Sequence, residues 1–128
     1  MGAGDALAEA LIAALNGLTG LNGAYDGAPL QAAFPHALVE TGPETDWSHK
    51  SGAGRELRLA VTIRDKGEKP ARLRALVGEV EGVIGAVPGT LLGWRLVTLV
   101  FLRSVMLRDS GAAWAATIEY RARLLAEA

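Results

Sequence analysis

The sequence predicts an α+β fold, a two-layer sandwich in which two helices cover one face of an antiparallel four-stranded sheet. Three observations lead to this prediction. Two segments carry apolar residues at helical spacing, several short segments have the alternating or apolar character of strands, and a turn near the C-terminus joins two long strands into a hairpin. Consecutive strands joined by turns favour antiparallel pairing, which leaves both helices on one face.

The first helix is expected from Asp5 to Asn16. Asp5 is a good N-cap, because its carboxylate would lie next to the positive helix end, and Gly17 ends the helix. The second helix is expected from Pro70 to Val87, since proline has no N–H to lose at the first helical position. Both segments repeat Leu, Ile or Val three or four residues apart, which gives each helix one apolar face.

Four strands are expected where turn residues separate apolar or alternating runs. They cover residues Ala37–Thr41, Glu56–Arg64, Trp94–Arg108 and Ala113–Leu125. Asp109-Ser110-Gly111, between the last two, is a hairpin turn signal, so these strands form a long C-terminal β-hairpin. The connection from Leu18 to Pro35 is rich in Gly, Asn and Pro and has room for one short strand near Ala24 and Tyr25.

The two hairpin strands distribute their polar residues differently. The return strand has one polar face, which includes Glu119, Arg121 and Arg123. Strict alternation gives the outgoing strand two apolar rows: Leu96, Val100, Leu102 and Met106 on one side, and Val97, Leu99, Phe101, Val105 and Leu107 on the other. A two-layer fold buries only one sheet face. The second row is either covered within the monomer, in part by the long side chains of Arg121 and Arg123, or it meets another subunit.

Length and composition indicate a single domain over residues 1–128. The chain has no Cys, which excludes disulfides, thiolate metal sites and a cysteine nucleophile. A formal net charge of −1 argues against a dedicated nucleic-acid binder, because such proteins usually have a basic excess. The N-terminus lacks a secretory signal and the longest apolar run is too short to span a bilayer, so we expect a soluble intracellular protein with no membrane partner.

The loop from Asp46 to Glu56 is polar apart from Trp47, and it contains two glycines, which allow backbone shapes that other residues resist. A tryptophan in such a loop either packs into the protein's own core or anchors a partner. Lys50, Arg55 and Glu56 beside it are either a solvated rim or the polar part of an interface. The strand that follows would hold the loop in place, which makes it a suitable binding surface.

Catalytic and metal-binding alternatives centre on His36 and His49, each of which has an acid nearby. A metal site needs three or four converging ligands. Asp46, Ser48 and His49 are too close in the chain to form a triad, because adjacent side chains diverge. The glycine-rich Ser51–Gly54 lacks the GK[ST] ending of a phosphate loop. We therefore expect no catalytic residue, cofactor or metal, with a small ligand-binding or hydrolytic domain at His36, Asp46 and His49 as the alternative.

Several motifs occur together in a characteristic order. An Ala/Leu-rich first helix is followed by Tyr25-Asp26-Gly27-Ala28-Pro29, Phe34-Pro35, Asp46-Trp47-Ser48-His49-Lys50-Ser51-Gly52-Ala53-Gly54-Arg55-Glu56, Gly93-Trp94-Arg95-Leu96-Val97, Leu107-Arg108-Asp109 and Glu119-Tyr120-Arg121-Ala122. With these motifs the sequence resembles, nearly end to end, the small tail-completion or tail-terminator proteins of long-tailed phages, prophages and gene transfer agents.

The resemblance implies a structural role and no enzymatic activity. Such proteins form ring caps, typically hexameric, that sit on the last ring of the tail tube, stop its polymerisation and offer a surface to the neck of the head. The implied partners are further copies of the chain, the tail tube protein and a head–tail connector or neck protein, while DNA passes through the lumen without sequence-specific binding. The implied location is the tail–neck junction of a phage-like particle that is assembled in the bacterial cytoplasm.

Another connector or neck adaptor is the alternative within the same structural class. In either case we expect an interface that combines the polar loop, the outgoing hairpin strand and the polar face of the return strand. Its residues are Trp47, Ser48, His49, Lys50, Arg55, Glu56, Leu99, Phe101, Arg121 and Arg123. A ring uses two different surfaces on each subunit, so one apolar patch and one complementary surface on the next copy are sufficient.

Overall fold

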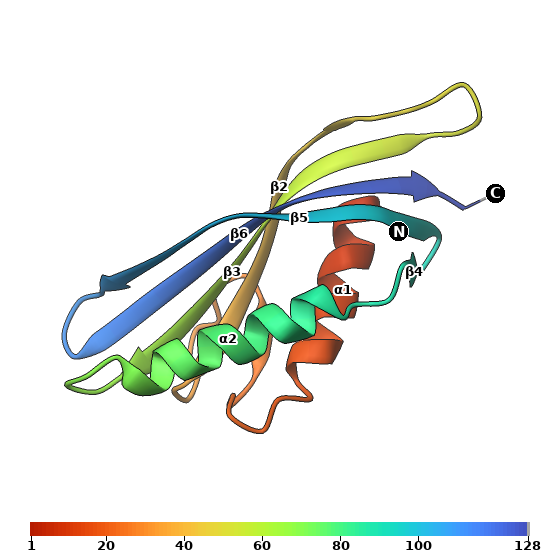
Figure 1. Cartoon of the computed structure of the whole chain (residues 1–128). Coiled ribbons are helices and arrows are strands. Elements are labelled where there is room, and N and C mark those ends of the chain that lie inside the picture. Colours follow the sequence, from red (N-terminus) through yellow and green to blue (C-terminus); the bar gives the residue numbers. More distant parts are fainter. Residues whose placement is uncertain (128) are drawn as a thin grey trace.

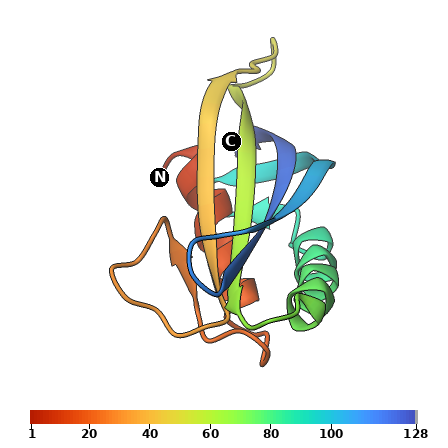
Figure 2. The same cartoon turned by 90° about the vertical axis from the view of Figure 1, so that its left-hand side faces the viewer.

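The computed structural model describes residues 1–127 as two helices and a six-stranded sheet (Figures 1 and 2). The elements are α1 (Ala3–Leu15), β1 (Ala24–Asp26), β2 (His36–Asp46), β3 (Gly54–Lys66), α2 (Ala71–Gly85), β4 (Thr90–Leu91), β5 (Trp94–Arg108) and β6 (Ala113–Ala126). The strand order in the sheet is β1-β2-β3-β6-β5-β4. The predicted α+β class and the long C-terminal hairpin, β5 and β6, are confirmed.

The predicted four-stranded antiparallel sheet is wrong in two respects. β1 adds a strand parallel to β2, with Ala24 opposite Ala37, and β4 pairs antiparallel with the first two residues of β5. The sheet is therefore mixed and six-stranded. The short strand expected near Ala24 and Tyr25 is present as β1, but strands of three and two residues carry too few side chains to show a period, so their places in the sheet could not be predicted from alternation.

Both helices pack on the same face of the sheet and share one core with β3 and β6. The sheet contributes Leu57, Leu59, Val61, Ile63, Ile118 and Leu124, and the helices contribute Leu7, Leu11, Leu15, Leu73, Leu76, Val80 and Ile84. The sheet curls, so that β4 at its far end also contacts α1 (Figure 1). Within residues 1–127 neither helix is long and apolar enough to cross a membrane.

The observed ends of several elements differ from the predicted ends, and the differences at α1 and β2 are the most informative. α1 begins at Ala3 with Gly2 as its N-cap, so Asp5 is not the cap but lies in the first turn, where its charge still favours the helix. β2 runs on to Asp46 instead of ending at Thr41, although the residues from Glu40 onward are exposed. A register shift at Gly42-Pro43 accommodates the proline, which has no N–H for the ladder, and pairing with β3 resumes at Glu44.

Asp65 fastens the end of β3 to the start of α2. Its buried carboxylate accepts hydrogen bonds from Arg72 Nε at 2.8 Å and from the second guanidinium nitrogen at 2.5 Å, and it also accepts the Lys66 N–H at 2.8 Å. Burial, the largest single influence, raises the pKa of Asp65, but the hydrogen bonds from Arg72 and Lys66 together outweigh it, so the pKa lies below its usual value. The ionised form is therefore the one that the fold stabilises.

Replacing Asp65 by Asn is expected to lower the free energy of unfolding by about 1–2 kcal/mol at pH 7, because hydrogen bonds to a charged group are lost and Arg72 is largely exposed. Because the folded-state pKa is depressed, the stability contribution is present above the unfolded pKa of about 4 and is lost as the pH falls through the folded value. Urea unfolding of both proteins from pH 7 to pH 3 checks this. A difference that stays constant over this range would contradict it.

Candidate functional site

Most of the large apolar side chains that the structure leaves exposed belong to β5. Within residues 1–127 they are Val97, Val100, Phe101, Leu102 and Leu107, with exposed fractions between 37% and 64%. We call these five residues the β5 strip. Over most of its length β5 is also an edge of the sheet, because β4 pairs only with Trp94 and Arg95. Five large apolar side chains left exposed on one edge strand are a feature that usually marks an interface.

Two β-bulges rearrange the faces of β5. Its register against β6 shifts between Leu96 and Thr98 and again between Phe101 and Arg103. Each bulge adds one residue to β5 and so changes the face on which the following side chains lie. The two rows predicted from strict alternation are therefore wrong. Leu96, Leu99, Phe101 and Met106 lie opposite helix-side residues of β6, whereas Val100, Val105 and Leu107 lie opposite its outer residues.

The two strand residues predicted for the interface, Leu99 and Phe101, differ in their exposure. Leu99 is half-buried and packs against the core. Phe101 is 50% exposed, and its ring meets the ring of Tyr120 edge-on, with 5.8 Å between the centroids. Of the two side chains, Phe101 is the one that the monomer leaves available for a partner.

Three arginines and no acidic residue accompany the β5 strip on the same strand. Arg103 forms an ion pair with Glu119 across to β6. The Arg108 guanidinium lies 4.1 Å from the centroid of the Trp114 ring and donates a hydrogen bond of 3.2 Å to the Glu68 carbonyl oxygen. The strip is therefore apolar with a basic border.

The loop between β2 and β3 projects from the end of the sheet (Figure 1). Its own hydrogen bonds hold it: Ser48 Oγ donates to Asp46 Oδ1 at 2.6 Å, and the His49 N–H donates to the Gly52 carbonyl oxygen at 2.8 Å. The hydrogen bond from Ser48 is the main reason why the pKa of Asp46 lies below its usual value. Ser48, His49 and Lys50 are exposed at the tip, so the loop presents polar groups from an ordered frame.

Trp47 is half-buried and packs within its own chain. The His49 ring meets it edge-on at 4.5 Å between centroids, and the Arg123 guanidinium lies 5.4 Å from the centroid of the Trp47 ring. Arg123 Nε also donates to Glu56 Oε1 at 2.8 Å, and this hydrogen bond is the main reason why the pKa of Glu56 lies below its usual value. Four predicted interface residues, Trp47, His49, Glu56 and Arg123, thus form one cluster.

The other predicted residues divide between this cluster and separate positions. Arg55 forms a 3.0 Å ion pair with Glu44 on β2, beside the loop. Arg121 lies opposite Arg58 on the outer sheet face, and its Nε is buried without a hydrogen-bond partner within residues 1–127. Phe101 lies opposite Tyr120, a helix-side residue, and so does not join Arg123 on the outer face. The residues predicted for the interface therefore lie mainly on two separate surfaces, the loop cluster of Trp47, His49, Glu56 and Arg123 and the β5 strip.

The structure keeps His36 apart from Asp46 and His49, the other residues named for a ligand-binding or hydrolytic site. His36 begins β2 and Asp46 ends it, so at about 3.3 Å per residue they lie roughly 30 Å apart. His36 is buried, and burial, with a smaller contribution from Arg64, lowers its pKa although the Ala33 carbonyl opposes this. Within residues 1–127 no group of His, Asp and Glu side chains is placed to hold a metal ion.

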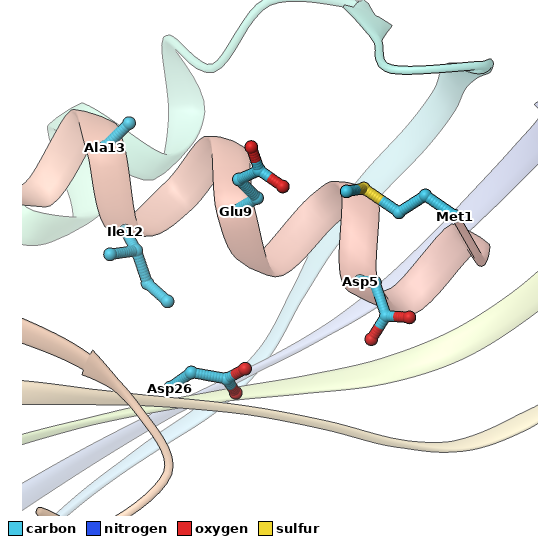
Figure 3. Close-up of a pocket in the computed structure, with 6 residues that line it drawn as sticks. All are labelled: Met1, Asp5, Glu9, Ile12, Ala13 and Asp26. Atoms are coloured by element: carbon cyan, nitrogen blue, oxygen red, sulfur yellow. The ribbon is translucent and has the colours of Figure 1, made fainter.

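A hollow of about 660 Å³ between α1 and β1 contains none of the predicted interface residues. It is lined by Met1, Asp5, Glu9, Ile12, Ala13 and Asp26. Ile12 points from α1 toward Asp26, whereas Glu9 and Ala13 point away from Asp26 (Figure 3). We call these six residues the α1 groove. The signal that could have indicated it is the charge distribution, because residues 1–46 contain acidic side chains but no Lys or Arg.

Residues 5–125 match the family described as "Tail completion protein gp17". The chain belongs to this tail completion family. A chain in the solved structure entitled "Virion of native gene transfer agent (GTA) particle" is 28% identical, with a TM-score of 0.65 and coverage of 96% of this chain and 94% of that chain. No curated protein sequence matches. The tail completion chain is thus a structural protein of a phage-like tail, and the resemblance inferred from its motifs is confirmed.

Gly54 provides the space that the loop of this tail completion chain requires. A Cβ at Gly54 would overlap the Trp47 carbonyl oxygen and would come within 2.9 Å of Leu125 Cδ2. Neither Gly52 nor Gly54 has a positive φ. The sequence-based expectation that both glycines supply unusual backbone shapes is therefore wrong, and at Gly54 it is the close approach of the Trp47 backbone that excludes a side chain.

Gly54→Ala is expected to displace the loop and to cost about 1–3 kcal/mol of stability, the range typical of overpacking. Gly52→Ala is the matched control, because a Cβ there would meet nothing within 4 Å, and it should change stability by less than about 0.5 kcal/mol. Thermal unfolding of both variants and the wild type provides the comparison. Equal melting temperatures for the two variants would show that the loop can move to accommodate a side chain at position 54 without loss of stability.

Proposed function

We propose that the chain forms a ring that caps the tail tube, ends its polymerisation and presents a surface for attachment of the head through the neck. Membership of the tail completion family supports a role in the tail. The observation that supports a self-assembling role is the β5 strip, whose five large apolar side chains are left exposed on one strand of the monomer. Solvent does not stabilise such a surface, whereas a neighbouring subunit would bury it.

The proposed ring is closed and has six subunits. Every subunit therefore makes the same contacts through its β5 strip. The contact is heterologous, so the strip of one copy meets a different surface on the next, and the ring closes when the rotation per subunit divides a full turn. The lumen of the ring would let DNA pass without sequence-specific contacts.

The loop cluster is the proposed contact to the tail tube protein. The loop projects from the end of the sheet and exposes Ser48, His49 and Lys50, while Arg55 and Glu56 at its base are fixed by ion pairs (Figure 1). In this arrangement Trp47 holds the loop against Arg123 and contributes its exposed portion to the contact. A preordered loop loses less conformational entropy on binding than a mobile one.

Particles produced with and without the protein test the function directly. We expect particles without it to show tails of uncontrolled length or heads without tails, and the wild-type protein supplied separately to restore uniform tails. Labelled protein should localise to the tail–neck junction. Localisation on the head in the absence of tails would favour a connector or neck adaptor instead, and normal tails without the protein would exclude the proposed function.

Trp47→Ala is expected to give a folded protein that does not cap tails, because the ring of Trp47 no longer supports the loop against Arg123 and His49. A tryptophan at the centre of an interface commonly contributes more than ~2 kcal/mol. Circular dichroism checks the fold, and electron microscopy checks tail length. Trp47→Phe keeps an aromatic ring at this position and should retain capping. Uniform tails with Trp47→Ala would show that Trp47 serves only to pack its own chain.

Leu107→Asp is expected to abolish ring formation while changing monomer stability by less than about 0.5 kcal/mol, because Leu107 is 64% exposed. Leu99→Asp, on the same strand, should instead cost about 2 kcal/mol or more of stability, since Leu99 packs on the core. Light scattering of the purified variants measures the assembly, and urea unfolding measures the stability. A Leu107→Asp protein that forms rings as well as wild type would place the strip outside the subunit interface.

A further inference from the structure

Charge is segregated along this chain. Residues 1–46 contain acidic side chains and no Lys or Arg, and all 13 basic residues lie from Lys50 onward. The sheet order carries this segregation into space, because β1 and β2 lie at one end of the sheet and β5 lies toward the other. The elements α1, β1 and β2 therefore carry acidic side chains without Lys or Arg, whereas the β5 strip is bordered by arginines.

The α1 groove lies on two of these acidic elements, α1 and β1. Its lining combines the apolar side chains of Met1, Ile12 and Ala13 with the three carboxylates of Asp5, Glu9 and Asp26. All three carboxylate residues are exposed, and none of them forms an ion pair within residues 1–127. The groove thus combines an apolar surface with negative charge that its own chain leaves uncompensated.

The β5 strip has the opposite charge and the same apolar character. Along the strand, Arg95 stands two residues before Val97, Arg103 directly follows Leu102, and Arg108 directly follows Leu107. Arg95 forms no ion pair within the described residues. The charge of Arg103 is only partly neutralised by its ion pair with Glu119, because the Arg103 side chain is 65% exposed. Strip and groove are complementary both in sign and in polarity.

Backbone pairing between copies is a poor alternative for this strand. The bulges at Val97 and Leu102 interrupt the regular spacing of backbone groups along β5. At the other end of the sheet, the exposed half of β2 is irregular at Gly42-Pro43, where proline offers no N–H. These irregularities limit strand addition to short stretches of either edge, so side chains carry most of the contact.

We propose that the α1 groove of one copy receives the β5 strip of the next copy, with the arginines of the strip facing Asp5, Glu9 and Asp26. This inference rests on the proposed ring and names the two surfaces that form it. A contact of strip against strip would place arginines against arginines, and groove against groove would place carboxylates against carboxylates. Only the unlike pairing matches charge, and unlike surfaces are what a closing ring requires.

Site-specific crosslinking tests the pairing cleanly, because the chain has no native Cys. Ala13→Cys places a thiol in the groove and Leu102→Cys places one on the strip, and neither change removes a charge. The two proteins are mixed, allowed to assemble, and treated with a short bis-maleimide. We expect a crosslinked pair in the mixture, no such product in either protein alone, and a ladder ending in a covalent ring when both changes are in one chain.

Ala75→Cys, on an exposed position of α2, is the matched control and should give no product with either protein. Crosslinking of the Leu102→Cys protein to itself would overturn the proposal in favour of a symmetric strip contact. Rings that form without any product between Ala13→Cys and Leu102→Cys would also overturn it, while the capping function would stand. Failure of the function itself would show separately, as normal tails in particles that lack the protein.

Discussion

The continuous pairing of β3 with β6 is the constraint on which the rest of the structure depends. Thirteen consecutive residue pairs, from Gly54 opposite Leu125 to Lys66 opposite Ala113, join strands that are far apart in sequence without a single bulge. This ladder decides which side chains face the helices and which face outward. The strands on either side of it, β2 and β5, are both irregular. A regular centre therefore carries two irregular flanks, and the β5 strip lies on one of them.

Much of this fold could be predicted from side-chain periods. The two helices, the long hairpin and the bounds of β5 follow from apolar spacing and from the turn at Asp109-Ser110-Gly111. The short strands β1 and β4 could not be assigned to the sheet in this way, because too few residues carry the pattern. The sequence also could not show on which face of the sheet each β5 side chain lies. Where both sides of a strand are apolar, an inserted residue does not disturb any visible alternation of polar and apolar residues.

The candidate site was predictable in its parts but not in its arrangement. A tryptophan in a polar loop indicates a binding surface at residues 46–56. In the structure, Trp47 forms a cluster with Arg123, which lies far from it in the sequence. Only the register of β3 against β6 reveals that neighbour. The α1 groove depends on β1 lying beside β2, a parallel pairing that the sequence did not indicate. The sequence contains the three acidic residues of the groove, but it does not show that they line the same hollow.

The bulges of β5 have a further consequence for the behaviour of the free subunit. An exposed strand edge with apolar side chains is a template on which identical chains can stack into fibrils. The extra residues at Val97 and Leu102 break the uniform backbone repeat that such stacking needs, and arginines on the same strand repel a copy of themselves. The strand is consequently protected against open-ended aggregation during the interval between synthesis and incorporation into a particle.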